Sequence, residues 1–199
     1  MRFHIGSIPE PEGGEPSGEW NSLSEPKPVM MQLIALPFGV VFGAIVGALW
    51  IYATPVTKNP VAHPVLMIGG MVALFPIHEL MHAIVHPGFG FSRHTTLGLW
   101  PSRLLAYAHY DGIISRNRFI AILAMPFLVI SILPLLICIV LGHASVTIAF
   151  ISSLNALGAC IDILGICILL FRVPSNAIVR NHGWRTYWNV PQGGAISFL

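Results

Sequence analysis

The sequence predicts an all-α membrane protein with about four transmembrane helices, and three observations lead to this prediction. First, 55% of the 199 residues are hydrophobic and only 9% are charged, whereas charged residues make up about 25% of a typical soluble domain. Second, four apolar stretches reach the roughly 20 residues that a helix needs to cross a bilayer. They cover residues 29–53, 62–85, 119–141 and 145–171. Third, the basic residues gather on one side of these stretches.

The distribution of lysine and arginine predicts how the spans are oriented. With four spans, nine of the ten Lys and Arg residues fall on one face of the membrane, and only Lys58 falls on the other. The face that is richer in Lys and Arg normally stays in the cytoplasm. We therefore expect a multi-pass protein of the cell membrane with both termini in the cytoplasm. The same split supports the number of spans, because removing one span would scatter the basic residues over both faces.

The segments outside the spans divide the chain into three parts. Residues 1–28 are rich in Pro, Gly, Glu and Ser and lack the layout of a signal peptide, so we expect a disordered acidic tail in the cytoplasm. Residues 29–172 form the four-span domain, and residues 173–199 form a cytoplasmic C-terminal tail. Residues 86–117, between the second and third spans, mix glycines with short apolar and aromatic runs. This pattern is typical of a short β-hairpin, which we expect at the cytoplasmic membrane face.

Charge and cysteine patterns exclude two kinds of site. The basic residues are scattered singly, so nothing resembles a phosphate-binding patch and nucleic acid is not an expected partner. Cys138, Cys160 and Cys167 lie inside apolar stretches, and no Cys-x-x-Cys occurs. Neither a disulfide framework nor a zinc site built from thiolates is therefore expected.

A His-Glu-x-x-His motif at residues 78–82 carries the chemistry of this sequence. Two imidazoles four residues apart share one face of a helix, so His78 and His82 can bind a single metal ion with Glu79 beside it. Ionisable groups at membrane depth are costly unless they are paired or hydrated, and such a cluster therefore indicates a function. The alternative is a satisfied polar cluster that bridges helices. Pro76, just before the motif, should loosen the helix there.

The motif leaves a third metal ligand to be found, because a catalytic zinc takes three protein ligands and a water. After Glu79 the only carboxylates are Asp111 and Asp162. We expect Asp162, because a lone carboxylate in an apolar span needs a partner, and because its depth in the fourth span matches that of His78 in the second. Asp111 precedes a glycine, which is typical of a turn. His86 precedes a proline, which biases it out of the helix toward a solvated position.

Asn155 lies seven residues before Asp162. Seven residues are two helical turns, so the two side chains would lie on nearly the same face of a continuous helix. The amide of Asn155 is then placed to bind substrate backbone or an oxyanion. An interhelical hydrogen bond is the alternative role.

The motif, followed on a later span by Asn155-Ala-Leu-Gly-Ala-Cys-Ile-Asp162, resembles the site-2 protease group of intramembrane metalloproteases. It resembles most closely a family of small bacterial membrane proteins described as putative zincin peptidases. The resemblance covers roughly residues 30–187. It implies that His78, His82 and Asp162 bind zinc, that Glu79 is the general base, and that Asn155 helps to hold the substrate.

Two positions depart from the site-2 pattern, and both concern substrate handling more than metal binding. Gly158 stands where that group has proline, and Ile163 stands where glycine follows the metal-binding aspartate. The resemblance also implies a use for residues 86–117, because site-2 proteases are thought to present an unwound substrate segment to a membrane-associated strand. Strand addition is physically reasonable, since a helix must unwind before its amides can be cut.

Together these observations predict a zinc-dependent intramembrane metalloprotease that hydrolyses peptide bonds of membrane-associated protein or peptide substrates. Zinc supplies a water with a pKa near 7, and Glu79 takes its proton and returns it to the leaving amine. The alternative is a non-catalytic regulatory or scaffold membrane protein that keeps a metal or polar site, although such a site has no need of Glu79. A zinc or proton transporter would need a polar path to both faces, and the outer halves of the spans are almost bare of charge.

Overall fold

The apolar stretches of the sequence form helices in the computed structural model, which describes residues 1–10, 14–16, 18–53 and 63–191. The first and second are α1 (Pro28–Ala53) and α2 (Pro64–Val85). The third runs through α3 (Arg116–Pro126), a π-helical segment η3 (Phe127–Ile132) and α4 (Leu133–Leu141). The fourth is divided into α5 (Val146–Gly158) and α6 (Cys160–Arg172), which are bent by 47° relative to each other.

Three of these units, α1, α2 and residues 116–141, are long and apolar enough to cross a membrane, and the bent pair α5–α6 would be a fourth. They agree in position with the four predicted spans. Lys58 and the predicted start of the second span at residue 62 lie outside the described residues.

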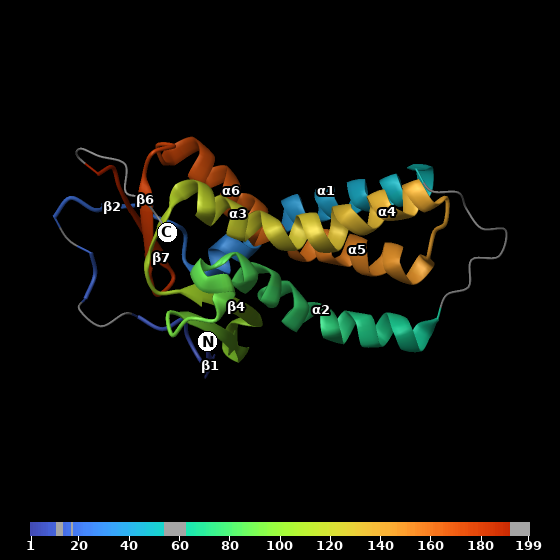
Figure 1. Cartoon of the computed structure of the whole chain (residues 1–199), viewed down its shortest axis with the longest axis horizontal. Coiled ribbons are helices and arrows are strands. Elements are labelled where there is room, and N and C mark those ends of the chain that lie inside the picture. The colour runs from blue at the N-terminus through green and yellow to red at the C-terminus, as the bar shows by residue number, and fades with distance from the viewer. Residues whose placement is uncertain (11–13, 17, 54–62, 192–199) are drawn as a thin grey trace.

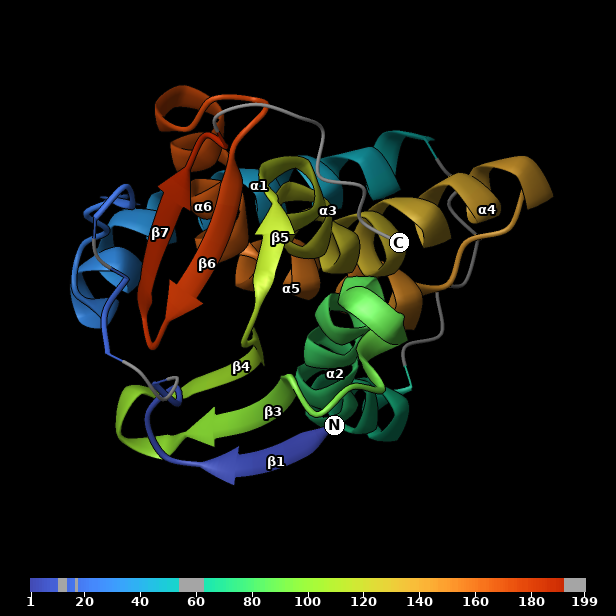
Figure 2. The same cartoon turned by 60° about the vertical axis from the view of Figure 1, so that its left-hand side comes forward.

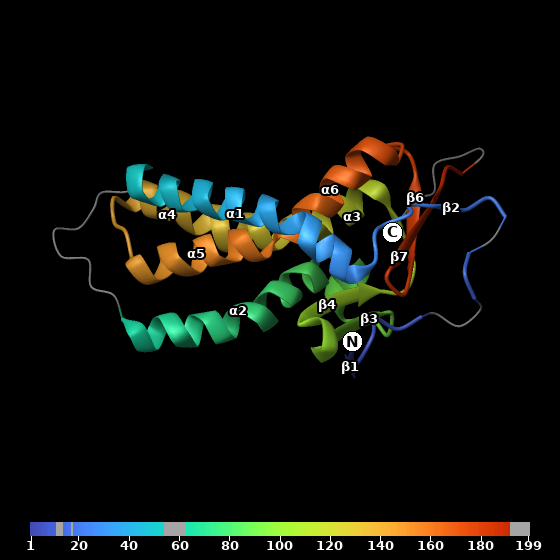
Figure 3. The same ribbon diagram turned by 180° about the vertical axis from the view of Figure 1, so that it is seen from behind.

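The helices form a bundle with two small sheets at one end (Figure 1). Helix α1 packs along α5 and α6. A side chain at Gly39 would collide with the Leu157 carbonyl oxygen, so glycine is what permits this close approach. Helix α2 lies beside the bundle (Figure 3) and contacts α3 and α5. The bundle therefore brings α2 and the α5–α6 pair together.

The first sheet contains the predicted hairpin. Strands β3 (Thr95–Trp100) and β4 (Leu105–Tyr110) pair antiparallel, with Leu97 opposite Ala108, and β1 (Arg2–Ile5) adds parallel to β3. The strand order is β1-β3-β4. Short 3-10 turns, η1 (Pro87–Gly90) and η2 (Pro101–Arg103), precede β3 and connect it to β4. The hairpin expected within residues 86–117 is confirmed.

The second sheet has the order β2-β7-β6-β5 and is antiparallel throughout. Its strands are β2 (Asn21–Ser22), β5 (Ile113–Ser115), β6 (Ile178–His182) and β7 (Arg185–Asn189). This sheet shares a buried core with α3 and α6, in which Ile114, Leu169 and Val179 are each less than 5% exposed. The two sheets meet at an angle, with α2 beside the first and α3 and α6 behind the second (Figure 2).

The two chain ends contain strands, whereas disorder was expected for residues 1–28 and no secondary structure was predicted for residues 173–199. Parts of residues 1–28 form β1 and β2, and Leu23 is only 5% exposed. Parts of residues 173–199 form β6 and β7, while residues 192–199 lie outside the described part. The prediction averaged composition over a long segment. It therefore missed short strands whose backbone groups are satisfied by pairing with sheets formed elsewhere in the chain.

Candidate metal centre

The motif residues lie on the last two turns of α2. His78 and His82 are one turn apart, and their ring centroids are separated by 5.0 Å. Ligand atoms of His78, Glu79 and His82 lie within 4.8 Å of one another, which makes them a candidate metal-binding group in the described part of the chain. Pro76 lies inside the same helix without ending it. The motif thus has the helical spacing that the sequence predicts.

Asp162 approaches the motif from the first turn of α6. One carboxylate oxygen lies 3.1 Å from His78 Nε2, and the other lies 3.5 Å from His82 Nε2. The three side chains are buried or nearly so. The expectation that the second and fourth apolar stretches bring His78 and Asp162 together is confirmed. Either carboxylate could therefore be the third ligand beside His78 and His82, because Glu79 and Asp162 each lie near both histidines.

Hydrogen bonds on the far side of each ring determine which nitrogen faces Asp162. His82 Nδ1 lies 2.7 Å from the Ile122 carbonyl oxygen, which can only accept, so Nδ1 carries the proton. His78 Nδ1 lies 2.9 Å from Asn155 Oδ1. Both Nε2 lone pairs are therefore directed toward the Asp162 carboxylate. The two Nε2 atoms and the carboxylate all carry lone pairs that point toward one another. Such groups repel unless a positive charge lies between them, either a proton on a ring or a metal ion.

Asn155 is buried behind His78. Its Nδ2 donates to the Pro126 carbonyl at 3.0 Å and to Ser131 Oγ at 2.9 Å, and the side chain is only 1% exposed. Both N–H groups of its amide therefore bond within the protein, and the expected contact with substrate or oxyanion stays a prediction. The interhelical hydrogen bond, the alternative role, is present. The helix breaks between α5 and α6 at Ala159, so Asn155 and Asp162 approach His78 from two helices rather than from one continuous helix.

The other candidate ligands lie elsewhere. His86 is 1% exposed, rather than solvated as expected, and its Nδ1 lies 3.2 Å from Thr95 Oγ1 on β3. Burial lowers its pKa to about 3, so the ring is neutral. Asp111 follows β4, where its backbone N–H donates to the His94 carbonyl.

Glu79 faces the first sheet. Its carboxylate lies near the backbone N–H of Ala108 on β4 and interacts with it electrostatically. Because β4 is the end strand of the described sheet, this N–H belongs to an edge that pairs with no other described strand. Glu79 therefore lies between the two histidines and a strand edge that has no partner strand in the described part of the chain.

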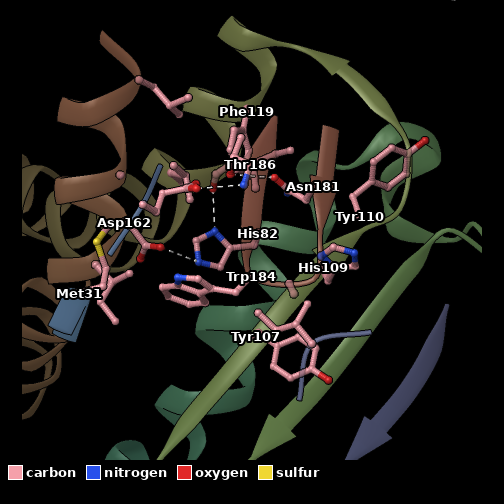
Figure 4. Close-up of a pocket in the computed structure, with 18 of the residues that line it drawn as sticks. Met31, His82, Tyr107, His109, Tyr110, Phe119, Asp162, Asn181, Trp184 and Thr186 are labelled. Atoms are coloured by element: carbon pink, nitrogen blue, oxygen red, sulfur yellow. Dashed lines mark hydrogen bonds and ion pairs between the residues drawn. The ribbon is translucent and has the colours of Figure 1, made fainter. Parts of the chain in front are cut away.

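A cavity of about 190 Å³ opens beside these groups. Glu79, His82 and Asp162 line one side, and Figure 4 shows the His82 ring beside the Asp162 carboxylate. Residues of β4, of the second sheet and of the N-terminal segment line the others, among them Tyr107, His109, Asn181, Trp184, Thr186, Ile8, Leu23 and Glu25. Sequence reasoning missed these residues, because they lie in segments without a motif or in segments expected to be tails.

The N-terminal segment is attached on both sides of this cavity. Tyr107 on β4 donates its hydroxyl to the Ser7 carbonyl at 3.2 Å, and Trp184 Nε1 donates to the Pro26 carbonyl at 2.9 Å. The Glu25 carboxylate accepts from the Thr186 backbone N–H at 3.0 Å, and burial raises the pKa of Glu25. The described residues of this segment thus bond to both sheets, and Ile8, Leu23 and Glu25 line the cavity.

One protein-family model matches the chain over residues 71–178, which is more than half of its length, and its description is "Putative zincin peptidase". The chain belongs to this family. The matched residues include the whole His-Glu-x-x-His motif, Asn155 and Asp162. The search of curated proteins and the search of solved structures found no match.

Membership of the zincin peptidase family supports a metallopeptidase and implies zinc as its metal. The donor set here fits that metal. Ligands about 2.0–2.1 Å from a tetrahedral zinc ion are about 3.3 Å from each other. The two contacts of Asp162 with the histidines, at 3.1 and 3.5 Å, lie on either side of that value. Two neutral imidazoles and a carboxylate are also the usual ligands of a catalytic zinc.

Proposed function

We propose that this zincin peptidase is a zinc-dependent intramembrane protease of the site-2 type, which hydrolyses peptide bonds of membrane-associated proteins or peptides. The observation that carries the proposal is the meeting of His78 and His82 with Asp162, with Glu79 beside them, on helices long and apolar enough to span a bilayer. His78, His82 and Asp162 are the proposed zinc ligands. Glu79 is left as the base, because the two oxygens of Asp162 already lie 3.1 and 3.5 Å from the two Nε2 atoms.

The surface of the helical bundle supports a membrane location. Large apolar side chains are exposed along it, such as Val65 on α2 at 81% and Val140 on α4 at 85%. Lipid is the solvent that accepts such a surface, because contiguous apolar patches of this extent are rare on soluble monomers. Within the described residues, every Lys and Arg belongs to the end that carries the sheets. That end, with β1 and β7, is the proposed cytoplasmic side.

The proposed reaction is amide hydrolysis. Zinc, when bound, supplies a water of lowered pKa and polarises the scissile carbonyl. Glu79 would take a proton from that water as its oxygen bonds to the scissile carbonyl carbon, and would return the proton to the amine nitrogen as the C–N bond breaks. His82 and His78 keep their Nε2 lone pairs directed to the metal because Ile122 and Asn155 hold their Nδ1 protons.

The free edge of β4 is the proposed binding site for the substrate. Ala108 directs its N–H toward Glu79, and the alternation of an antiparallel pair then directs Ala106 and Tyr110 to the same edge. An extended segment that pairs with this edge brings a peptide bond next to Glu79. A helical segment cannot pair there, because its own amides are already bonded. The substrate class is therefore a membrane-associated segment that can unwind.

The test compares wild-type protein with Glu79→Gln in liposomes that contain quenched fluorescent peptides based on transmembrane segments. We expect the variant to keep its zinc, because the ligands are intact, and to lose at least about 100-fold in hydrolysis, because the base is gone. Equal hydrolysis by both proteins would contradict the role of Glu79. A wild type that binds zinc and cleaves none of the peptides would favour the non-catalytic scaffold.

A further inference from the structure

A chain of hydrogen bonds runs from His78 into the core of the helical bundle, away from the cavity. It begins at Asn155, whose Oδ1 meets His78 Nδ1 and whose Nδ2 donates to Pro126 and Ser131. It continues through a pair of serines on neighbouring helical segments. Ser131 Oγ donates to the Ser152 carbonyl and Ser152 Oγ donates to the Ser131 carbonyl, each at 2.8 Å.

The chain reaches α1 at Trp50, whose Nε1 donates to Ser152 Oγ at 2.9 Å. Ser131 is 0% exposed, Ser152 and Asn155 are 1% exposed, and Trp50 is 4% exposed. Each serine hydroxyl donates one hydrogen bond and accepts one. The network therefore links α1, η3, α5 and α2 through buried side chains whose N–H and O–H groups all donate hydrogen bonds within the protein.

The direction of each bond follows from the chemistry of the acceptors. The Pro126 carbonyl can only accept, and the hydroxyl proton of Ser131 is committed to the Ser152 carbonyl. The group of Asn155 that faces both must therefore be its NH₂. This leaves Oδ1 as the atom that meets His78, so His78 Nδ1 must carry the proton and Nε2 must keep its lone pair.

A π-helical turn places Ser131 in this network. Pro134 lacks the N–H that would bond to the carbonyl four residues before it. In the turn just ahead, the Leu133 N–H bonds to the Leu128 carbonyl, five residues back. Such π-turns occur often at functional sites. Here the turn carries the only described π-helical segment, and its buried serine points to Asn155.

We infer that Ser131, Ser152 and Trp50 are positioning residues for the metal centre. They hold the Asn155 amide in one orientation, and that orientation holds His78 in the tautomer that can bind a metal. The inference rests on the proposed function, because it takes His78 as a zinc ligand. Partners that orient a ligand in this way are typically worth 10- to 100-fold in metal affinity.

A purely packing role for the serines is the competing explanation, and Ser153 provides a matched control. Ser153 neighbours Ser152 on α5, but its hydroxyl donates to the Ala149 carbonyl of its own helix. Ser153→Ala removes a hydroxyl from the same helix without touching the network. Ser131→Ala removes an acceptor of the Asn155 amide.

The experiment measures zinc affinity in detergent by competition with a chromophoric chelator, together with the thermal unfolding of the metal-free proteins. We expect Ser131→Ala to weaken zinc binding by about 10-fold or more, Ser152→Ala to weaken it less, and Ser153→Ala to leave it unchanged. In an Asn155→Ala background, Ser131→Ala should cause no further loss of affinity, because its effect passes through Asn155. Packing alone would instead lower the unfolding temperature of the metal-free protein and leave the affinity unchanged.

Two outcomes separate this inference from the proposed function. If wild-type protein binds zinc and Ser131→Ala binds it equally well, or if the losses from Ser131→Ala and Asn155→Ala simply add, the positioning network is wrong while the metal centre stands. If wild-type protein binds no zinc, the metal centre itself is wrong, and the inference falls with it. If Ser131→Ala fails to fold, the zinc affinity of Ser152→Ala is compared with that of the wild type in the same way.

Discussion

The Asp162 carboxylate lies 3.1 Å from His78 Nε2, although the two residues are 84 positions apart in the chain. The contact depends on the break between α5 and α6, since Asp162 lies in the first turn of the second of these helices. The bend of 47° turns α6 relative to α5, while Asn155 remains on α5 behind the His78 ring. One broken helix thus supplies both the carboxylate in front of His78 and the amide behind it.

A proline at position 108 tests the proposed substrate edge. The Ala108 N–H faces Glu79 rather than β3, so Ala108→Pro should spare the β3–β4 pairing, as prolines on sheet edges do. We expect the variant to fold and to bind zinc, and its peptide hydrolysis to fall at least several-fold because strand addition is blocked. Zinc content and cleavage of the liposome peptides check this. Full hydrolysis by Ala108→Pro would place the substrate elsewhere.

Removal of residues 2–20 tests whether the N-terminal segment limits access to the metal centre. This deletion takes away β1 and Ile8 but keeps Leu23 and the bond between Glu25 and Thr186. We expect zinc to pass to a chelator several-fold faster, and peptide hydrolysis to rise, because the cavity mouth is opened.

The control for this deletion is Arg185→Ala. It removes only the exposed ion pair with Glu15, and exposed pairs contribute little. The control should behave as the wild type does. Equal rates of zinc loss in the deletion variant and the wild type would show that the segment does not cover the site.

His109 gives the sheet end a pH dependence. Burial lowers its pKa from 6.5 to about 4; Asp111 opposes this shift, while Arg2 and His182 add to it. The unfolded chain takes up a proton near pH 6.5 and the folded chain only near pH 4, so stability is complete above pH 6.5 and falls as the pH drops toward 4. The loss at pH 4.5 should be on the order of 2 kcal/mol.

Denaturant unfolding at pH 7.5 and 4.5 measures this loss. His109→Gln cannot take up the proton, so it should lose less stability than the wild type between these two values. His86, which is also buried and neutral, keeps part of the pH dependence in both proteins. If His109→Gln and the wild type lose the same stability, the buried neutral state of His109 is wrong.

Sequence reasoning identified the parts of this protein that local patterns encode. Hydrophobic length predicts α1 and α2, because a membrane-length helix needs a long apolar run. Short apolar and aromatic runs between glycines predict the β3–β4 hairpin, and depth along two parallel spans predicts the meeting of His78 with Asp162. Each of these predictions depends on residues that are near in the sequence, or on the position of a residue along its span.

The remaining features depend on pairings that no local pattern encodes. Strand β1 pairs with β3 across more than ninety residues, and β2 pairs with β7 across more than one hundred and sixty. The register of such pairs is set by the assembled sheets. The break between α5 and α6 at Ala159 was not predicted either, because residues 145–171 read as one uninterrupted apolar stretch in the sequence. The cavity wall formed by Trp184 and Thr186 follows from the same long-range assembly.

The most direct test of the metal centre is the zinc content per chain of detergent-purified wild type, Asp162→Ala and Asp111→Ala. The Asp162 carboxylate contacts both histidines, whereas Asp111 lies in a turn after β4. We predict near-stoichiometric zinc in the wild type and in Asp111→Ala, and loss of zinc in Asp162→Ala. Absence of zinc from the wild type, or loss of zinc only in Asp111→Ala, would contradict the centre formed by His78, His82 and Asp162.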